Sequence, residues 1–315
     1  FYGFIEGGHR YFPEEWNLEE SQVKSQYDGY RTKLSRNGKP SVETEYLTDA
    51  LSREALSFVK AHQEEPFFLY LAYNAPHTPL QSTREDYDAL SFIPDHTMRV
   101  YAAMIRSLDR NIGRVLQALK DQGVDDNTLV IFTSDNGQVI DDGYKDDAVE
   151  KLGNHKPNGI YRGGKYSAFE AGTRVPFIVS WKGKVKAGKV NDALFSQVDL
   201  YASLAALAGV KVEAGQAPDS KNYLQVLLNQ SNKPREFLVE QSINSTLSLL
   251  VGDWKYIEPS KGPKINKDTN TELGNDPKPQ LYNLATDPGE TKNLAEVYPE
   301  RVAEMKLKLD NIRQK

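Results

Sequence analysis

Short polar segments of this 315-residue chain carry the side chains best suited to chemistry. Asp135 and Asn136 are neighbouring hard oxygen donors, which suit Ca²⁺, or less well Mg²⁺, rather than zinc. His77 lies in a loop with two prolines and could carry a proton or contact an oxyanion. Lys165 follows two glycines, which let a backbone and a lysine approach an anion closely.

Each of these residues also has an ordinary structural interpretation. Asp135 and Asn136 with the next glycine can form a simple turn, and His77 and Lys165 can be solvated loop residues. The combination of these residues is more informative than each alone, because a metal, a cation and an imidazole at one sheet edge would bind a tetrahedral oxyanion. Phosphate and sulfate esters are the corresponding substrates.

The elements that must position these residues follow from hydrophobic periodicity. Apolar residues at helical spacing predict helices over 47–59, 98–119 and 197–208. Short β-branched and aromatic runs predict buried strands over 67–73, 128–133 and 175–181. Helices that alternate with buried strands predict an α/β fold with a mainly parallel sheet. Ligands bind beyond the carboxyl ends of such strands, where His77 and Asp135 stand.

The pattern changes after about residue 235. Short strands are predicted over 237–241, 247–251 and 254–257, and a charged terminal helix over 298–314. We therefore predict two domains: 1–235, which carries the candidate site, and 236–315, a small α+β subdomain with short antiparallel strands. Residues 9–40 and about 137–170 are polar and are predicted to be long loops.

Composition excludes several classes of protein. The net charge is −5 and there is no basic run, so a nucleic acid is not expected as a partner. Since there is no stretch of about 18 apolar residues, no membrane span is expected. The chain has no cysteine, which excludes disulfides and thiolate sites and fits a bacterial protein. It begins without Met or a signal-peptide pattern, so any targeting signal is expected upstream.

Four segments together resemble the type I sulfatase family of arylsulfatase-like enzymes. They are 67–79 (FFLYLAYNAPHTP), 130–137 (VIFTSDNG), 162–176 (RGGKYSAFEAGTRVP) and 281–294 (LYNLATDPGETKNL). Their order and separations also match.

The resemblance implies an alkaline-phosphatase-like α/β sandwich and a set of roles. It implies that Asp135 and Asn136 are calcium ligands, that His77 protonates the leaving group, and that Lys165 binds a sulfate oxygen.

One departure from the family is large. Sulfatases use a formylglycine made from Cys or Ser within a C/S-x-P-S/A-R motif, and this chain contains no such motif. The family's N-terminal aspartate pair and its lysine-x-histidine segment have no counterpart either. The resemblance therefore implies an N-terminal half, with the first strands of the sheet, as the chain's main partner. Because two ligands cannot complete a Ca²⁺ shell of six to eight oxygens, and no nucleophile is present, these 315 residues alone are predicted to be inactive.

The loop 141–162 bears on the substrate. Asp141, Asp142, His155 and Arg162 suit the hydroxyls of a sugar, although a solvated loop of charges is the other interpretation. The pattern resembles bacterial carbohydrate sulfatases. It implies a sulfated carbohydrate (galactose or N-acetylgalactosamine sulfate) or an aryl sulfate as substrate, and a periplasmic or secreted location.

Other functions stay open at this point. A phosphodiesterase or phosphonate hydrolase of the same superfamily would need a Thr or Ser nucleophile and commonly a zinc set, but the five histidines show no zinc-ligand spacing. A sulfated-glycan-binding remnant without turnover, or a fragment without a function of its own, would need none of this machinery.

Overall fold

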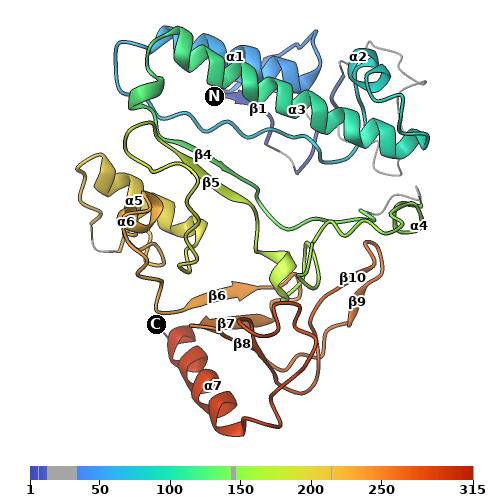
Figure 1. The fold of residues 1–315 in the computed structure, drawn as a ribbon, viewed down its shortest axis with the longest axis vertical. Coiled ribbons are helices and arrows are strands. Elements are labelled where there is room, and N and C mark those ends of the chain that lie inside the picture. Colours follow the sequence, from blue (N-terminus) through green and yellow to red (C-terminus); the bar gives the residue numbers. More distant parts are fainter. Residues whose placement is uncertain (6, 13–33, 143–146, 214, 315) are drawn as a thin grey trace. The chain divides into compact units, whose positions relative to one another are not determined.

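The computed structural model describes residues 1–5, 7–12, 34–142, 147–213 and 215–314. It forms two compact units (Figure 1). The first unit comprises Phe1–Thr128 with Asp141–Gly153, and the second comprises Leu129–Ile140 with Asn154–Lys315. These limits differ from the predicted domain boundary between residues 235 and 236, which stays a prediction.

The first unit is built mainly from helices. Its elements are β1 (Tyr2–Gly3), β2 (Leu34–Arg36), β3 (Lys39–Ser41), α1 (Leu47–Ala61), α2 (Arg84–Asp88), α3 (His96–Asp121), the 3₁₀ turn η1 (Asp125–Asn127) and α4 (Ala148–Lys151). Helices α1 and α3 confirm the predictions over 47–59 and 98–119.

The predicted long loop over 9–40 is wrong at its end and lies outside the described residues over 13–33. Strands β2 and β3 form an antiparallel hairpin, in which Arg36 pairs with Lys39. The turn residues Asn37 and Gly38 have φ of 50° and 81°. An Asn-Gly pair favours this tight turn because both of its positions need positive φ.

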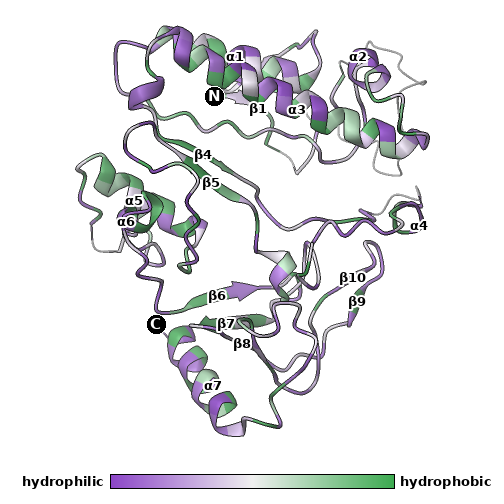
Figure 2. Ribbon diagram, viewed as in Figure 1, coloured by the Kyte–Doolittle hydropathy of each residue, from purple (hydrophilic) through white to green (hydrophobic). Residues whose placement is uncertain are grey.

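The core of the first unit lies where α1 and α3 pack together. Leu47 and Leu51 of α1 join Val100 and Met104 of α3 in one buried cluster. Both helices are amphipathic, with hydrophobic and hydrophilic residues interspersed along their length (Figure 2). Asp95 begins α3 by accepting a hydrogen bond from the Met98 amide at 2.9 Å.

The predicted strand over 67–73 is not a strand in the described structure. Exposure alternates along it, as expected for extended backbone: Leu71 and Tyr73 pack on the core, whereas Phe68 and Tyr70 are 73% and 81% exposed. A strand is defined by hydrogen bonds to a neighbour, and no strand of the described ranges pairs with this segment.

The second unit combines sheets and helices. Its elements are β4 (Val130–Thr133), η2 (Glu170–Gly172), β5 (Phe177–Ser180), η3 (Gln197–Asp199), α5 (Leu200–Leu207), α6 (Leu224–Leu227), β6 (Leu238–Gln241), β7 (Leu247–Val251), β8 (Trp254–Ile257), β9 (Ile265–Asn266), β10 (Thr271–Glu272), β11 (Gln280–Asn283) and α7 (Pro299–Arg313). Together with the first unit, these elements confirm the predicted α/β class.

The strands predicted over 128–133 and 175–181, which we expect in a mainly parallel sheet, are antiparallel neighbours in the structure. Strands β4 and β5 pair antiparallel, with Val130 opposite Ser180 and Thr133 opposite Phe177. Parallel neighbours need a crossover that returns the chain to the same end of the sheet, usually through a long helix. The chain between β4 and β5 carries only short helical turns in its described part, so β5 begins at the edge where β4 ends.

The C-terminal part of the second unit is a four-stranded antiparallel sheet with the order β11-β8-β7-β6. Helix α7 packs on one face of it, where Met305 and Leu309 contact a cluster that includes Leu249, Tyr256 and Leu281. The predicted strands over 237–241, 247–251 and 254–257 and the predicted helix over 298–314 are confirmed to within one residue at each end.

Candidate functional site

Two loops of the second unit meet at one edge of the β4–β5 pair. The Asp135 loop (residues 134–138) follows β4, and the Lys165 segment (residues 162–174) precedes β5. In an antiparallel pair the end of one strand lies beside the start of the next, so both loops leave the same edge. The Gly137 amide donates to the Gly172 carbonyl at 3.0 Å, and the Lys165 amide donates to the Gln138 carbonyl at 2.8 Å.

Glycines allow this close approach. A Cβ atom on Gly137 would lie 1.6 Å from the Ala171 carbonyl oxygen, and one on Gly164 would lie 2.7 Å from the Gln138 carbonyl oxygen. Gly164 makes room for the neighbouring loop, which gives that glycine a structural reason. The approach of an anion to this backbone stays a prediction.

The Asp135 loop presents two hard oxygen donors. Asp135 is exposed and Asn136 is half-buried. The Asn136 side-chain nitrogen donates to the Gly137 carbonyl at 3.0 Å, which orients the amide. The Gln197 side-chain amide of η3 donates a 2.8 Å hydrogen bond to the Ser134 carbonyl and so holds the loop.

The donors fit a hard cation in kind but not in number. Ca²⁺ takes six to eight oxygens. Within the described ranges, no three His, Cys, Asp or Glu side chains gather to hold a metal ion. Asp135 and Asn136 therefore supply at most part of a calcium shell.

Lys165 stands on the same backbone assembly as Asp135. Its side chain is half-buried, and its ammonium nitrogen lies 5.3 Å from the centre of the Tyr166 ring. Tyr166 has φ of 81°, and its carbonyl accepts the Ile243 amide at 3.1 Å. The backbone on both sides of Lys165 is thus fixed, and its amide is hydrogen-bonded to the loop that carries the two oxygen donors.

His77 belongs to the first unit. Its Nδ1 lies 2.7 Å from the Thr78 carbonyl oxygen, which can only accept, so Nδ1 carries a proton. Its Nε2 lies 4.0 Å from a carboxylate oxygen of Asp142, to which the Thr78 hydroxyl donates at 3.3 Å. Tyr11 fixes the loop by donating to the His77 carbonyl at 2.8 Å. Asp142, predicted to bind a sugar, is therefore next to the imidazole.

The remaining predicted substrate residues differ in their surroundings. Burial and the charges of Glu150 and Asp142 raise the pKa of Asp141. His155 is exposed, and the predicted loop around it is undescribed over 143–146.

Arg162 is held inside the second unit. Its guanidinium donates to both carboxylate oxygens of Glu272 and, at 2.6 Å, to the Glu290 carbonyl. It also lies 4.0 Å from the centre of the Phe169 ring. These contacts describe a structural residue, and its role in substrate binding stays a prediction that no contact supports.

The sequence did not predict a group of buried charged residues in the second unit. Lys255 and Glu290 are 0% exposed and Glu170 is 3% exposed. Glu290 lies in the segment 281–294 that resembles the family, but nothing local in that segment indicates burial. Burial raises the pKa of Glu290 to about 7, against the opposing charge of Lys255.

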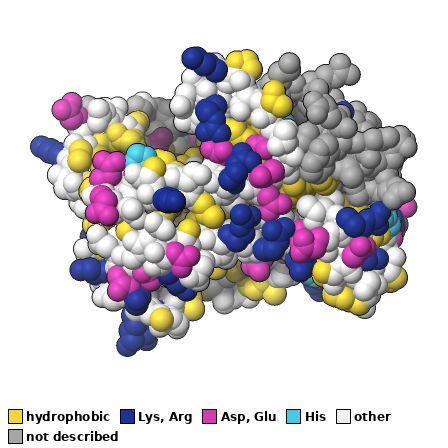
Figure 3. Space-filling view, turned by 90° about the horizontal axis from the view of Figure 1, so that it is seen from above, with side chains coloured by type: hydrophobic (Ala, Val, Ile, Leu, Met, Phe, Trp, Pro, Cys, Tyr) yellow, Lys and Arg dark blue, Asp and Glu magenta, His cyan; other side chains and the backbone are white. Residues whose placement is uncertain are grey.

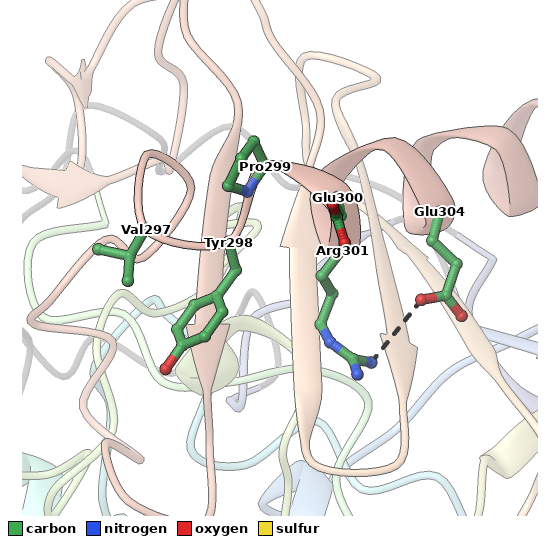
Figure 4. Close-up of a pocket in the computed structure, with 6 residues that line it drawn as sticks. All are labelled: Val297, Tyr298, Pro299, Glu300, Arg301 and Glu304. Atoms are coloured by element: carbon green, nitrogen blue, oxygen red, sulfur yellow. Dashed lines mark ion pairs between the residues drawn. The ribbon is translucent and has the colours of Figure 1, made fainter.

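A surface pocket forms where α7 begins (Figure 4). Its lining residues are Val297, Tyr298, Pro299, Glu300, Arg301 and Glu304. None of the predicted site residues is among them, and Arg301 pairs with Glu304 at 4.0 Å. The pocket is therefore separate from the predicted site residues of the second unit.

Charge on the visible face of Figure 3 is mixed. Lys and Arg side chains are interspersed there with Asp and Glu rather than gathered into a patch of one sign. In the part of the chain that the structure describes, none of the helices combines the length and apolarity needed to cross a membrane.

Comparison with known proteins identifies related sequences and structures. A family model described as "Sulfatase" matches residues 2–210. The N-acetylgalactosamine-6-O-sulfatase of Bacteroides thetaiotaomicron is 46% identical over 269 residues, which cover 85% of this chain and 51% of that protein. The chain thus spans about half the length of this relative.

Two solved structures extend the comparison. One, described under the metabolism of multiple glycosaminoglycans by B. thetaiotaomicron, has a TM-score of 0.82 at 40% identity and covers all of this chain and 66% of that one. The other, Ps i-CgsB in complex with k-i-k-neocarrahexaose, has a TM-score of 0.77 at 34% identity and covers 98% of this chain and 65% of that one.

The contact between the two loops yields a first prediction. Gly137→Ala should destabilise the second unit by about 2 kcal/mol or more, because its Cβ would overlap the Ala171 carbonyl. Gly113→Ala in α3 is the matched control: a Cβ there meets nothing within 4 Å, and alanine favours a helix by ~0.5–1 kcal/mol. Urea unfolding measures both. Equal stability of the two variants would contradict the tight contact.

The raised pKa of Glu290 yields a second prediction. The folded state binds this proton more tightly than the unfolded state, so the resulting stability is fully present below about pH 4.5 and is lost as the pH rises through about 7. Glu290→Gln cannot titrate. The unfolding free energy of the wild type should therefore fall relative to this variant by roughly 1–3 kcal/mol between these pH values. Parallel pH profiles would show that Glu290 keeps its ordinary pKa.

Proposed function

Because the chain belongs to the sulfatase family, we propose that it forms part of a sulfuric ester hydrolase acting on a sulfated glycan. The observation that carries this proposal is the backbone assembly that holds Asp135, Asn136 and Lys165 together. Such an arrangement offers a cation and two metal-binding oxygens to a tetrahedral anion. We propose 6-sulfated N-acetylgalactosamine as the substrate, since a relative of that named activity is 46% identical.

The residues divide the work by their chemistry. Lys165 donates hydrogen bonds to a sulfate oxygen, and its ammonium offsets the negative charge. Asp135 and Asn136 contribute two ligands to Ca²⁺, and the other ligands come from elsewhere in the protein. When bound, the ion supplies positive charge to the sulfate oxygens.

His77 is the proton donor to the leaving group. Its Nδ1 proton is committed to the Thr78 carbonyl, so Nε2 is the nitrogen that delivers a proton to the departing sugar oxygen. Asp142, 4.0 Å from Nε2, stabilises the charged imidazolium before the transfer.

The attacking group lies outside these residues. The sequence contains no cysteine and no serine in the C/S-x-P-S/A-R pattern. We propose that a formylglycine elsewhere in the protein attacks sulfur, and that these 315 residues alone do not turn over sulfate esters. Asp141, Asp142 and His155 are proposed to contact the sugar, and a periplasmic or secreted location fits such a substrate.

Substrate choice tests the proposed function. The protein expressed from its complete gene should release sulfate from 6-sulfated N-acetylgalactosamine, and Lys165→Ala should lower kcat/KM by about 100-fold or more. Lys264→Ala, which changes a lysine that is 72% exposed, is the matched control and should leave kcat/KM unchanged. Faster hydrolysis of an aryl phosphate than of any sulfate ester would instead identify a phosphoester hydrolase. Binding of the sulfated sugar without turnover would identify a glycan-binding protein.

The leaving group tests the role of His77. His77→Ala should slow hydrolysis of the sugar sulfate about 100-fold, but an activated aryl sulfate far less, because a good leaving group needs little protonation. His62→Ala, at the end of α1, is the control and should affect neither substrate. Equal losses on both substrates would assign His77 to binding rather than to proton transfer.

A further inference from the structure

Lys255 is a fully buried lysine in the middle of β8. Strand residues alternate between the two faces of a sheet. The neighbouring Tyr256 packs toward α7, whereas Ile257, on the face of Lys255, packs against Ala168 and Phe169 of the Lys165 segment. The ammonium therefore lies between the sheet and the Lys165 segment.

The Lys255 ammonium forms ion pairs with three carboxylates. The Lys255 nitrogen lies 2.9 Å from Glu170, 3.4 Å from Glu240 and 3.5 Å from Glu290. We call these four residues the Lys255 cluster. Burial alone would lower the pKa of Lys255, but the charges of Glu240, Glu170 and Glu290 outweigh it and raise the pKa above its ordinary value.

The cluster joins separate parts of the second unit. Glu170 belongs to η2 within the Lys165 segment, Glu240 to β6, and Glu290 to the turn after β11. One oxygen of Glu290 also accepts the backbone amide of Glu170 at 2.7 Å. The cluster thus contacts both a side chain and a backbone amide of the Lys165 segment, those of Glu170.

Backbone hydrogen bonds connect the position of Glu170 to that of Lys165. The Ala171 amide donates to the Arg162 carbonyl at 2.9 Å, which closes the segment into a loop. Within that loop the Ser167 amide donates to the Gly164 carbonyl at 3.0 Å. Glu170 stands directly before this closure and Lys165 stands inside it, so a shift of Glu170 changes the path of the backbone that carries Lys165.

We propose that Lys255 is a positioning residue for Lys165, acting through Glu170 and Glu290. It draws the Lys165 segment onto the C-terminal sheet and so sets where the anion-binding ammonium stands relative to the Asp135 loop. The consequence for the reaction rests on the proposed function. The mechanical claim does not, because it concerns contacts within this chain.

The charge balance supports a tether rather than simple packing. The three carboxylates of the Lys255 cluster face the Lys255 ammonium and the Arg174 guanidinium, which lies 2.9 Å from Glu170. Removing Lys255 would take away the ammonium that holds these carboxyl groups together, and η2 would lose its charged contact with the sheet whether the carboxyl groups stay charged or take up protons.

Hydrogen exchange tests the mechanical claim. In Lys255→Met, the amides of Lys165 and Ala171 should exchange at least tenfold faster than in the wild type, whereas the Leu249 amide of β7 keeps its rate. Lys264→Met, the exposed control, should change none of them. Unchanged exchange, or an equal rise at Leu249, would overturn the proposal. If Lys255→Met does not fold, Glu240→Gln keeps the buried ammonium and takes its place with the same readouts.

Kinetics of the protein expressed from its complete gene test the link to Lys165. Lys255→Met should raise KM for the sulfate ester at least fivefold with a smaller change in kcat. The same substitution added to Lys165→Ala should have no further effect on KM, because the group that Lys255 positions is already gone. Additive effects would overturn the proposal. A wild type that is inactive on sulfate esters would refute the proposed function instead, and hydrogen exchange would still decide the positioning role.

Discussion

The contact between the Gly137 amide and the Gly172 carbonyl constrains the rest of the candidate site. At 3.0 Å it joins the loop after β4 to the segment before β5, and at Gly137 the neighbouring Ala171 carbonyl leaves no room for a side chain. Because backbone groups form the contact, it fixes the backbone of the Asp135 loop against that of the Lys165 segment. The segments that carry the candidate cation and the two candidate oxygen donors therefore leave the same edge of the β4–β5 pair.

The four-stranded sheet of the second unit, with α7, supports these loops. One face of the sheet packs on α7 through apolar side chains, and the other face meets the Lys165 segment through buried charges. Hydrogen bonds between charged groups are directional, and a buried charge that loses its partner is costly. These contacts from the sheet therefore set one position of the segment, which suits the anion-binding role proposed for Lys165.

The sequence predicted some of these features well and others for the wrong reason. Helices α1 and α3 were predictable because their apolar periodicity is long, and the C-terminal strands because turns separate them clearly. Asp135 and Lys165 were predicted to lie at one sheet edge, and backbone hydrogen bonds join the segments that carry them, although β4 and β5 are antiparallel. Lys255 stands between Trp254 and Tyr256 and looks like a solvent-facing residue of an alternating strand. The carboxylate partners of Lys255 lie far away in the sequence. Only the fold therefore shows that both faces of that sheet are covered and that Lys255 is buried.

The central claim is that the Asp135 loop and the Lys165 segment form one anion-binding assembly. Titration of ¹⁵N-labelled protein with inorganic sulfate in the presence of Ca²⁺, followed by amide chemical shifts, tests it most directly. The account predicts that the amides of 135–138 and 164–167 shift together along one binding curve. Shifts confined to the separate pocket around Tyr298 and Arg301, with the two loops unchanged, would contradict it.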